Sequence, residues 1–210
     1  MSRTILSVSA PKRHLCKVTF TDGTVLELDS DICAALVLKE GQQLTEEQIK
    51  SHKAASDTER ARSRALWYLS RSDHSEKALK DKLVKAGFEK TVAESTVLRL
   101  KNVGLLNDEA LCVRLAESLL RENRSIREAE QKLILKGISR DLARSVLSEF
   151  EVDSKEQIKA LVMKKYKNKL STEEDVRRTV QALMRKGFRF GDIKAVLKSF
   201  SSELYECEEM

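Results

Sequence analysis

Aromatic side chains and histidines are scarce in this 210-residue sequence, at 5% and three residues respectively. Charged residues, by contrast, make up 34% of the chain and hydrophobic residues 41%. This balance is typical of amphipathic helices, each with one apolar stripe and a wide solvated face. It does not suggest the sheet core of a large enzyme. The length suffices for one large domain or several small ones.

Residues that carry catalysis or bind metals are also lacking. His14, His52 and His74 stand alone in polar surroundings, where an exposed residue without a function is the better interpretation. No histidine or cysteine pair has the spacing of metal ligands. The repeated glycines follow expected helices, and no glycine of the sequence precedes Lys-Ser or Lys-Thr, so no phosphate-binding loop is expected. The sequence therefore predicts no enzymatic activity, no metal and no cofactor.

Cysteines and long apolar runs are equally limited. Cys16, Cys33, Cys112 and Cys207 are scattered and form no dense disulfide framework, so a reduced compartment is the simplest account. No stretch approaches the roughly 20 apolar residues of a membrane span. The amino terminus has no apolar run typical of a signal peptide. We therefore expect a cytoplasmic protein without membrane contact.

A short motif is present three times. It reads Leu83-Val-Lys-Ala-Gly-Phe88, Leu133-Ile-Leu-Lys-Gly-Ile138 and Leu183-Met-Arg-Lys-Gly-Phe188, and the glycines are fifty residues apart. In each copy a helix with apolar residues three and four apart runs up to the glycine, which supplies a left-handed position that ends it. Apolar residues recur in equivalent columns on both sides of the glycine. Such repetition predicts stacked supersecondary units.

Helix start and end signals divide the repeated part into three-helix units. We expect these repeats at residues 56–106, 107–152 and 153–203, followed by an acidic tail at 204–210 that frays. Capping residues are expected at Ser75, Asn107 and Ser125, the last within a capping box that ends at Glu128. The fold class predicted is mainly α, with three tandem three-helix repeats.

Residues 1–55 differ from the repeats and predict a small α+β module. Two alternating, β-prone runs flank Asp22-Gly23, which is a strong hairpin signal. A short helix is expected over 31–39, and Thr45 to Gln48 resembles a capping box that opens another helix.

Basic residues are the most informative charged ones. The formal net charge is +6, which permits binding to nucleic acid or to an acidic protein surface. A dense group lies in the third unit and comprises Lys164, Lys165, Lys167, Lys169, Arg177, Arg178, Arg185, Lys186 and Arg189. Part of this group complements helix dipoles. Its density nevertheless favours a contact surface for phosphates or acidic side chains.

A second basic group lies in the first repeat. It comprises Arg60, Arg62, Arg64 and Arg71, for which a contact surface and a solvated helix face are equally good interpretations. Trp67 lies among these arginines, in the expected first helix of the repeat. Since a single tryptophan is more often a core residue than a platform for stacking bases, we expect it in the core, with Tyr68 pointing elsewhere.

Three stretches together carry a family resemblance. They are Ala65-Leu-Trp-Tyr-Leu-Ser70 with Ser75-Glu76, the joint Gly104-Leu-Leu-Asn-Asp-Glu109, and Ser125-Ile-Arg leading to Lys136-Gly-Ile138. In their order and spacing the chain resembles the RecX family of bacterial regulators of the RecA recombinase. The amino-terminal hairpin is similar to an extension found in some branches of that family. The resemblance covers nearly the whole chain.

The resemblance implies an elongated, curved array of three tandem three-helix units without enzymatic activity. It implies binding along the groove of the RecA nucleoprotein filament and suppression of its ATPase and strand exchange. Regulation of DNA repair and of the SOS response would follow. We expect a monomer with weak, non-specific DNA binding. The candidate contacts to RecA or DNA are the group in the third unit together with Arg60, Arg64 and Arg71.

An alternative from the residues alone is a tandem helical protein that acts directly on DNA, because three-helix units can place a helix in the major groove. Tight, salt-dependent and sequence-selective DNA binding without any recombinase would favour this alternative.

Overall fold

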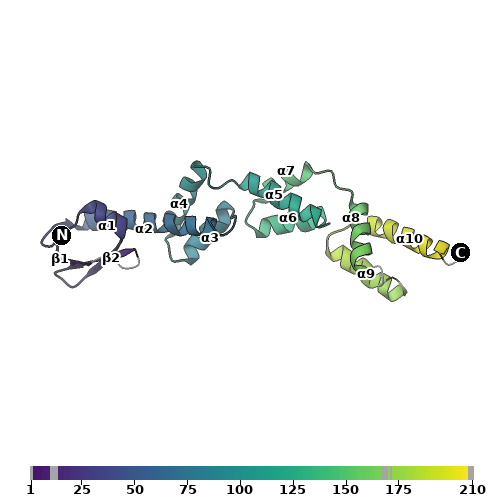
Figure 1. The fold of residues 1–210 in the computed structure, drawn as a ribbon, viewed down its shortest axis with the longest axis horizontal. Helices are drawn as coiled ribbons and strands as arrows, with labels where there is room; N and C mark the ends of the chain where they lie inside the picture. Colours follow the sequence, from purple (N-terminus) through teal and green to yellow (C-terminus); the bar gives the residue numbers. More distant parts are fainter. Residues whose placement is uncertain (1, 10–13, 167–169, 171, 208–210) are drawn as a thin grey trace. The chain divides into compact units, whose positions relative to one another are not determined.

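The computed structural model describes residues 2–9, 14–166, 170 and 172–207, with side chains described as far as residue 200 (Figure 1). The chain forms two compact units, residues 1–106 and 107–210. No described helix is both long and apolar enough to cross a membrane.

The first unit opens with a four-stranded antiparallel sheet of strand order β3-β2-β1-β4. Its strands are β1 (Ser2–Val8), β2 (Leu15–Phe20), β3 (Val25–Asp29) and β4 (Gln43–Thr45). The hairpin expected around Asp22-Gly23 is confirmed, since β2 and β3 pair directly across it. The sequence did not indicate β1 or β4, because β1 has a single buried residue, Ile5, and β4 is only three residues long.

Apolar side chains from this sheet form the core of the module. Phe20, Leu28 and Leu44 are among its most deeply buried members. A short helix, α1 (Ser30–Leu36), packs beside them and ends at Val37, whose backbone is left-handed. The expected helix over 31–39 is therefore confirmed, although it ends three residues earlier.

A single helix of 24 residues, α2 (Glu46–Leu69), joins the module to the first repeat. The capping box at its start is confirmed, since Thr45 and Gln48 bond reciprocally. The helix continues without a break through the expected division at residues 55/56. Ser56 is fully buried there, and its Oγ accepts a hydrogen bond of 2.6 Å from the backbone N–H of Asp29. Module and repeat therefore share one helix.

The rest of the chain consists of three-helix repeats, which confirms the predicted fold class. The second and third helices of the first repeat are α3 (Glu76–Lys85) and α4 (Lys90–Asn102). The second repeat comprises α5 (Asp108–Arg121), α6 (Ile126–Leu135) and α7 (Arg140–Ser148). The third comprises α8 (Ser154–Leu161) with a π-helical continuation η1 (Val162–Tyr166), α9 (Glu173–Arg185) and α10 (Phe190–Cys207). Part of the tail expected to fray thus belongs to α10.

The same hydrogen-bonded turn ends the second helix of every repeat. Gly87, Gly137 and Gly187 have φ angles of 95°, 90° and 87°. After α3, the N–H of Gly87 bonds to the Val84 carbonyl at 3.0 Å and that of Phe88 to the Leu83 carbonyl at 3.2 Å. Equivalent pairs of bonds follow α6 and α9. This is the Schellman arrangement, in which glycine avoids the steric cost of a left-handed residue.

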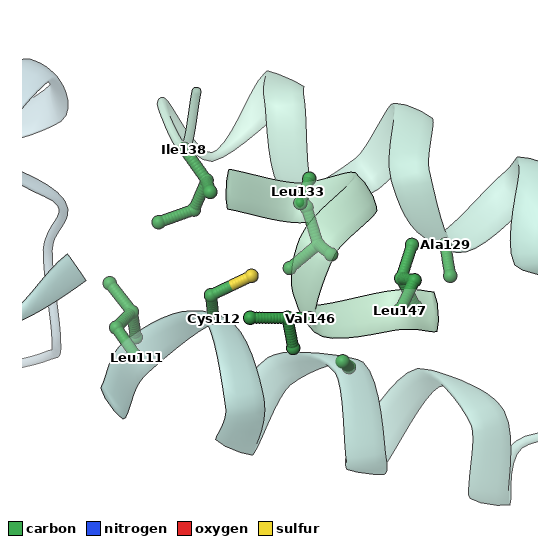
Figure 2. Packing of buried hydrophobic residues seen from close by; sticks show 9 residues of the cluster. Leu111, Cys112, Ala129, Leu133, Ile138, Val146 and Leu147 are labelled. Atoms are coloured by element: carbon green, nitrogen blue, oxygen red, sulfur yellow. The ribbon is translucent and has the colours of Figure 1, made fainter. Parts of the chain in front are cut away.

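Each repeat has its own apolar core, and the second repeat illustrates the packing (Figure 2). Leu111 and Cys112 project from α5, Leu133 from α6, and Val146 and Leu147 from α7 into the space between the helices. The apolar columns deduced from the sequence are thus the core-facing sides of the helices. The residue after each glycine joins the same core, with Ile138 and Phe188 buried and Phe88 half-buried.

The capping residues expected at Ser75, Asn107 and Ser125 all accept a backbone N–H at the start of their helices. The capping box at Ser125 is wrong in one respect. The carboxylate of Glu128 does not bond back to the cap but pairs with the guanidinium of Arg124. The guanidinium of Arg124, one residue before the cap, has taken the carboxylate in place of the backbone N–H, because two ionised groups attract more strongly than a carboxylate and an amide.

One position in the repeats carries a buried hydroxyl. Thr96 occupies the column in which the other repeats have Val146 and Val196, and it is only 3% exposed. Its Oγ1 has no hydrogen-bond partner within the described residues. A desolvated hydroxyl without a partner costs free energy relative to a methyl group of similar shape.

We therefore expect Thr96→Val to raise the free energy of unfolding of the first unit by about 1 kcal/mol. Urea denaturation followed by circular dichroism would measure this free energy of unfolding. Slower hydrogen exchange in α4 would assign the gain in stability to the first unit. Thr96→Ala serves as the control and should destabilise, since it deletes the packed methyl as well. A loss of stability in Thr96→Val would show that the hydroxyl is satisfied.

Candidate functional site

Hydrogen bonds tie the second repeat to the third. Ser125 Oγ, which caps α6, donates to the backbone carbonyl of Lys186 at 2.5 Å. From the third repeat, the Gln157 Nε2 donates to the carbonyl of Arg124 at 3.0 Å. Ser125 and Gln157 are both buried, at 5% and 8% exposure. The turn after α9 is therefore anchored on the start of α6.

Close packing at Gly187 reinforces this joint. A Cβ atom at Gly187 would lie 2.8 Å from Ser125 Oγ and 2.9 Å from Arg127 Cβ, closer than Cβ atoms approach other side chains. The equivalent Gly87 has nothing within 4 Å of such an atom. Gly187 thus has two roles: it ends α9, and it lets the second repeat approach.

A groove of about 570 Å³ lies beside this joint, between α6, η1 and α9. Its lining residues are Glu128, Gln131, Lys132, Leu135, Tyr166, Ala182, Arg185 and Lys186. Leu135 is 85% exposed, the most exposed large apolar side chain among the described residues. We call this set of residues the α6/α9 groove.

The groove combines this apolar side chain with uncompensated positive charge. Lys132, Arg185 and Lys186 form no ion pair with a carboxylate of the described chain. The one acidic residue, Glu128, is already bonded to Arg124 and raises the pKa of that guanidinium. An exposed leucine surrounded by cations suits a partner with acidic side chains around an apolar one.

The structure separates the basic residues that the sequence grouped together in the third repeat. Arg185 and Lys186 line the α6/α9 groove. Arg177 and Arg178, about two helical turns earlier, face Glu173 and Glu174 at 3.9 and 2.5 Å. The remaining candidates lie elsewhere: Lys164 and Lys165 are exposed on η1, Arg189 lines a separate hollow with Arg127, and Lys167 and Lys169 lie outside the described residues.

The sequence did not indicate Lys132, Leu135 and Tyr166 as site residues. A signal for Leu135 exists, because the other repeats have cations, Lys85 and Arg185, in its column. No equivalent signal exists for Tyr166, which lies at the end of the π-helical segment. A π turn shifts the following side chains out of α-helical register, and such turns are frequent at functional sites.

The basic group of the first repeat also divides in two. Arg60 pairs with Asp57 at 3.4 Å and Arg62 with Glu59 at 2.6 Å. Arg64 and Arg71 instead lie over the Trp67 ring, with 5.6 and 4.4 Å between the guanidinium carbon and the ring centroid. These distances are those of cation–π contacts.

Trp67 itself contradicts the expectation of a core residue, since it is 44% exposed. The buried side of α2 is set by Ala61 and Ala65, both fully buried. Trp67 follows Ala65 by two positions, about 200° around the helix, and so points away from the core. The residue type alone suggested that the Trp67 side chain is buried, but its position around the helix leaves it exposed.

Comparison with known proteins gives the family. Residues 61–100 match the family model of the first three-helix domain of RecX, and residues 151–197 match that of the third. The chain belongs to the RecX family. The two matched segments fall on the first and third repeats described above, and they include Trp67, Tyr166 and Arg185.

Individual RecX proteins resemble this chain over different lengths. The regulatory protein RecX of Clostridioides difficile (strain 630) is 32% identical over 87 residues, which span 41% of this chain and 41% of that protein. A crystal structure of regulatory protein RecX has a TM-score of 0.65 at 22% identity, covering 92% of this chain and 98% of that one. RecX from Lactobacillus salivarius has a TM-score of 0.60 at 21% identity, covering 70% and 98%. The two structures show a shared fold.

The joint between the second and third repeats can be tested by comparing two glycines. Gly87→Ala and Gly187→Ala both place a Cβ at a left-handed position, at a cost of about 1–2 kcal/mol. Only Gly187→Ala also forces the Cβ against Ser125 and Arg127, for about 1–3 kcal/mol more. We expect faster hydrogen exchange in α6 and α9 for Gly187→Ala, and in α3 alone for Gly87→Ala. Unchanged exchange in α6 of Gly187→Ala would show that the joint is not packed as described.

Proposed function

We propose that this chain binds the nucleoprotein filament of the RecA recombinase and lowers its ATPase and strand-exchange activities. Membership of the RecX family is the observation that carries the proposal, together with relatives named as regulatory proteins. In this proposal the chain is a non-catalytic, cytoplasmic regulator of DNA repair that acts as a monomer.

The α6/α9 groove supports the proposal as a place for protein contact. It presents Leu135 as an apolar anchor, and Lys132, Arg185 and Lys186 as uncompensated cations. A few central side chains surrounded by polar contacts contribute most of the binding energy at many protein interfaces, and arginine is common among them. Repeated three-helix units also provide extended surface, as contact with a repetitive filament requires.

The DNA-dependent ATPase rate of the cognate RecA, titrated with this chain, tests the function. We expect inhibition at well below one copy per recombinase, because one chain bound to a filament affects many protomers. DNA binding by RecA should be followed in the same samples to show whether the filament persists. An unchanged ATPase rate at equimolar protein, with the filament intact, would contradict the proposal.

Charge reversal in the third repeat should locate the contact. We expect Arg185→Glu with Lys186→Glu to weaken inhibition about tenfold or more, since both residues line the groove without an acidic partner. Arg177→Glu with Arg178→Glu changes the same net charge outside the groove, where both arginines are already paired, and should have a smaller effect.

Leu135→Asp extends this test to the apolar anchor. At 85% exposure, Leu135 can be replaced without disturbing the core, so circular dichroism should not change and the urea midpoint should fall only slightly, because an acidic residue then stands at the carboxyl end of α6. We expect inhibition to fall as strongly as in the Arg185/Lys186 variant. Full inhibition by both variants would move the contact away from the α6/α9 groove.

A further inference from the structure

The end of α2 carries an exposed aromatic residue between two arginines. Arg64 and Trp67 are three positions apart on α2 and so lie on one face, whereas Arg71 follows in the turn after the helix ends at Leu69. Their guanidinium groups lie over the indole ring, with Arg71 the closer of the two at 4.4 Å. We call these three residues the Arg-Trp-Arg strip. It is separate from the α6/α9 groove and has no part in the proposal above.

The charge of the strip is not neutralised by the described part of the chain. Arg60 and Arg62, on the same helix, each have a carboxylate within 3.4 Å or less. No such pair is found for Arg64 or Arg71 among the described residues, whose cationic groups rest on the ring instead. A ring contact leaves the guanidinium N–H donors available to an anion, because it uses the face of the group rather than its edge.

The neighbouring side chains hold the indole in place. Tyr68 meets the Trp67 ring edge-on, with 5.3 Å between centroids. Lys82, on α3, lies 4.9 Å from the centroid of the Tyr68 ring. Trp67 is thus braced on one side while 44% of it remains exposed. A held aromatic surface loses little conformational freedom when a ligand stacks on it.

We propose that the Arg-Trp-Arg strip binds single-stranded nucleic acid, with an unpaired base stacked on Trp67 or on the guanidinium plane of Arg71. Arg64 and Arg71 contact the flanking phosphates. Stacking on aromatic or arginine planes, next to cations that contact the backbone, is how proteins bind single strands without sequence preference. The bases of a duplex are not available for such stacking. The strip therefore selects unpaired strands, and this inference holds whether or not the chain acts on a recombinase.

Trp67 is the only tryptophan of the sequence, so its fluorescence reports on this site alone. The full chain, without recombinase, is titrated with oligothymidylate and, in parallel, with an abasic phosphodeoxyribose oligomer of equal length. We expect strong quenching by oligothymidylate, through base stacking, and little by the abasic oligomer or by duplex DNA. Oligouridylate distinguishes DNA from RNA and should quench similarly, since the strip contains no group that reads the sugar.

Variants are compared by the anisotropy of a labelled oligothymidylate. Trp67→Ala should weaken binding about tenfold or more, while Trp67→Phe should retain most of it because the aromatic face remains. Replacing Arg64 and Arg71 by alanine should lower the slope of log affinity against log salt by roughly 0.7 for each phosphate that the protein no longer neutralises. Arg62→Ala, on the same helix but ion-paired, is the matched control and should have little effect.

Two results would overturn the proposal. Equal quenching by the abasic oligomer would show that only phosphates bind. The absence of quenching by every oligonucleotide would show that the strip binds no nucleic acid, and quenching by a protein partner would then make it a protein contact. Loss of inhibition in the ATPase titration leaves the result of this experiment unaffected, so the two proposals can fail separately.

Discussion

The glycine turn after the second helix of each repeat is the constraint on which the repeated structure depends. It ends the helix with two backbone hydrogen bonds and directs the following apolar residue back into the core. Without a residue that tolerates positive φ, the third helix could not begin where its apolar side faces the first two. The three repeats therefore share the same helix-ending turn, and each has its own apolar cluster.

The same turn is used differently where two repeats meet. At Gly187 the missing side chain leaves space for Ser125 and Arg127, and the carbonyl of the preceding residue accepts a hydrogen bond from Ser125. The cap of α6, the end of α9 and the joint between the second and third repeats thus depend on the same few atoms. The position of α9 against α6, and with it the shape of the α6/α9 groove, follows from this contact.

Much of the fold could be predicted from the sequence, because its signals are local. Capping residues, glycines and apolar columns depend only on neighbours three or four positions apart, so the helices and the β2–β3 hairpin were recognised. Strands β1 and β4 were not, since their pairing is with distant residues and they contribute few buried side chains. The pairing of Glu128 with Arg124 was missed because two local interactions compete for one carboxylate.

The candidate site was less predictable than the fold. Residue type identified Arg185 and Lys186, but not that Lys132, Leu135 and Tyr166 come together with them from other helices. Arg178 was grouped with the other cations, although its partner Glu174 lies four positions earlier on the same helix and the spacing alone indicates the pair. The prediction for Trp67 was wrong in another way. As the single tryptophan it was expected in the core, but its angular position on α2 exposes it.

Hydrogen exchange of the full chain, with and without RecA assembled on single-stranded DNA, tests the account most directly. It follows the binding surface without any mutation. We predict that the filament slows exchange at the end of α6 and in α9 around the α6/α9 groove, while the β1–β4 sheet is unchanged. Protection confined to other parts of the chain, or none under conditions where the ATPase is inhibited, would contradict the assignment of this groove as the contact.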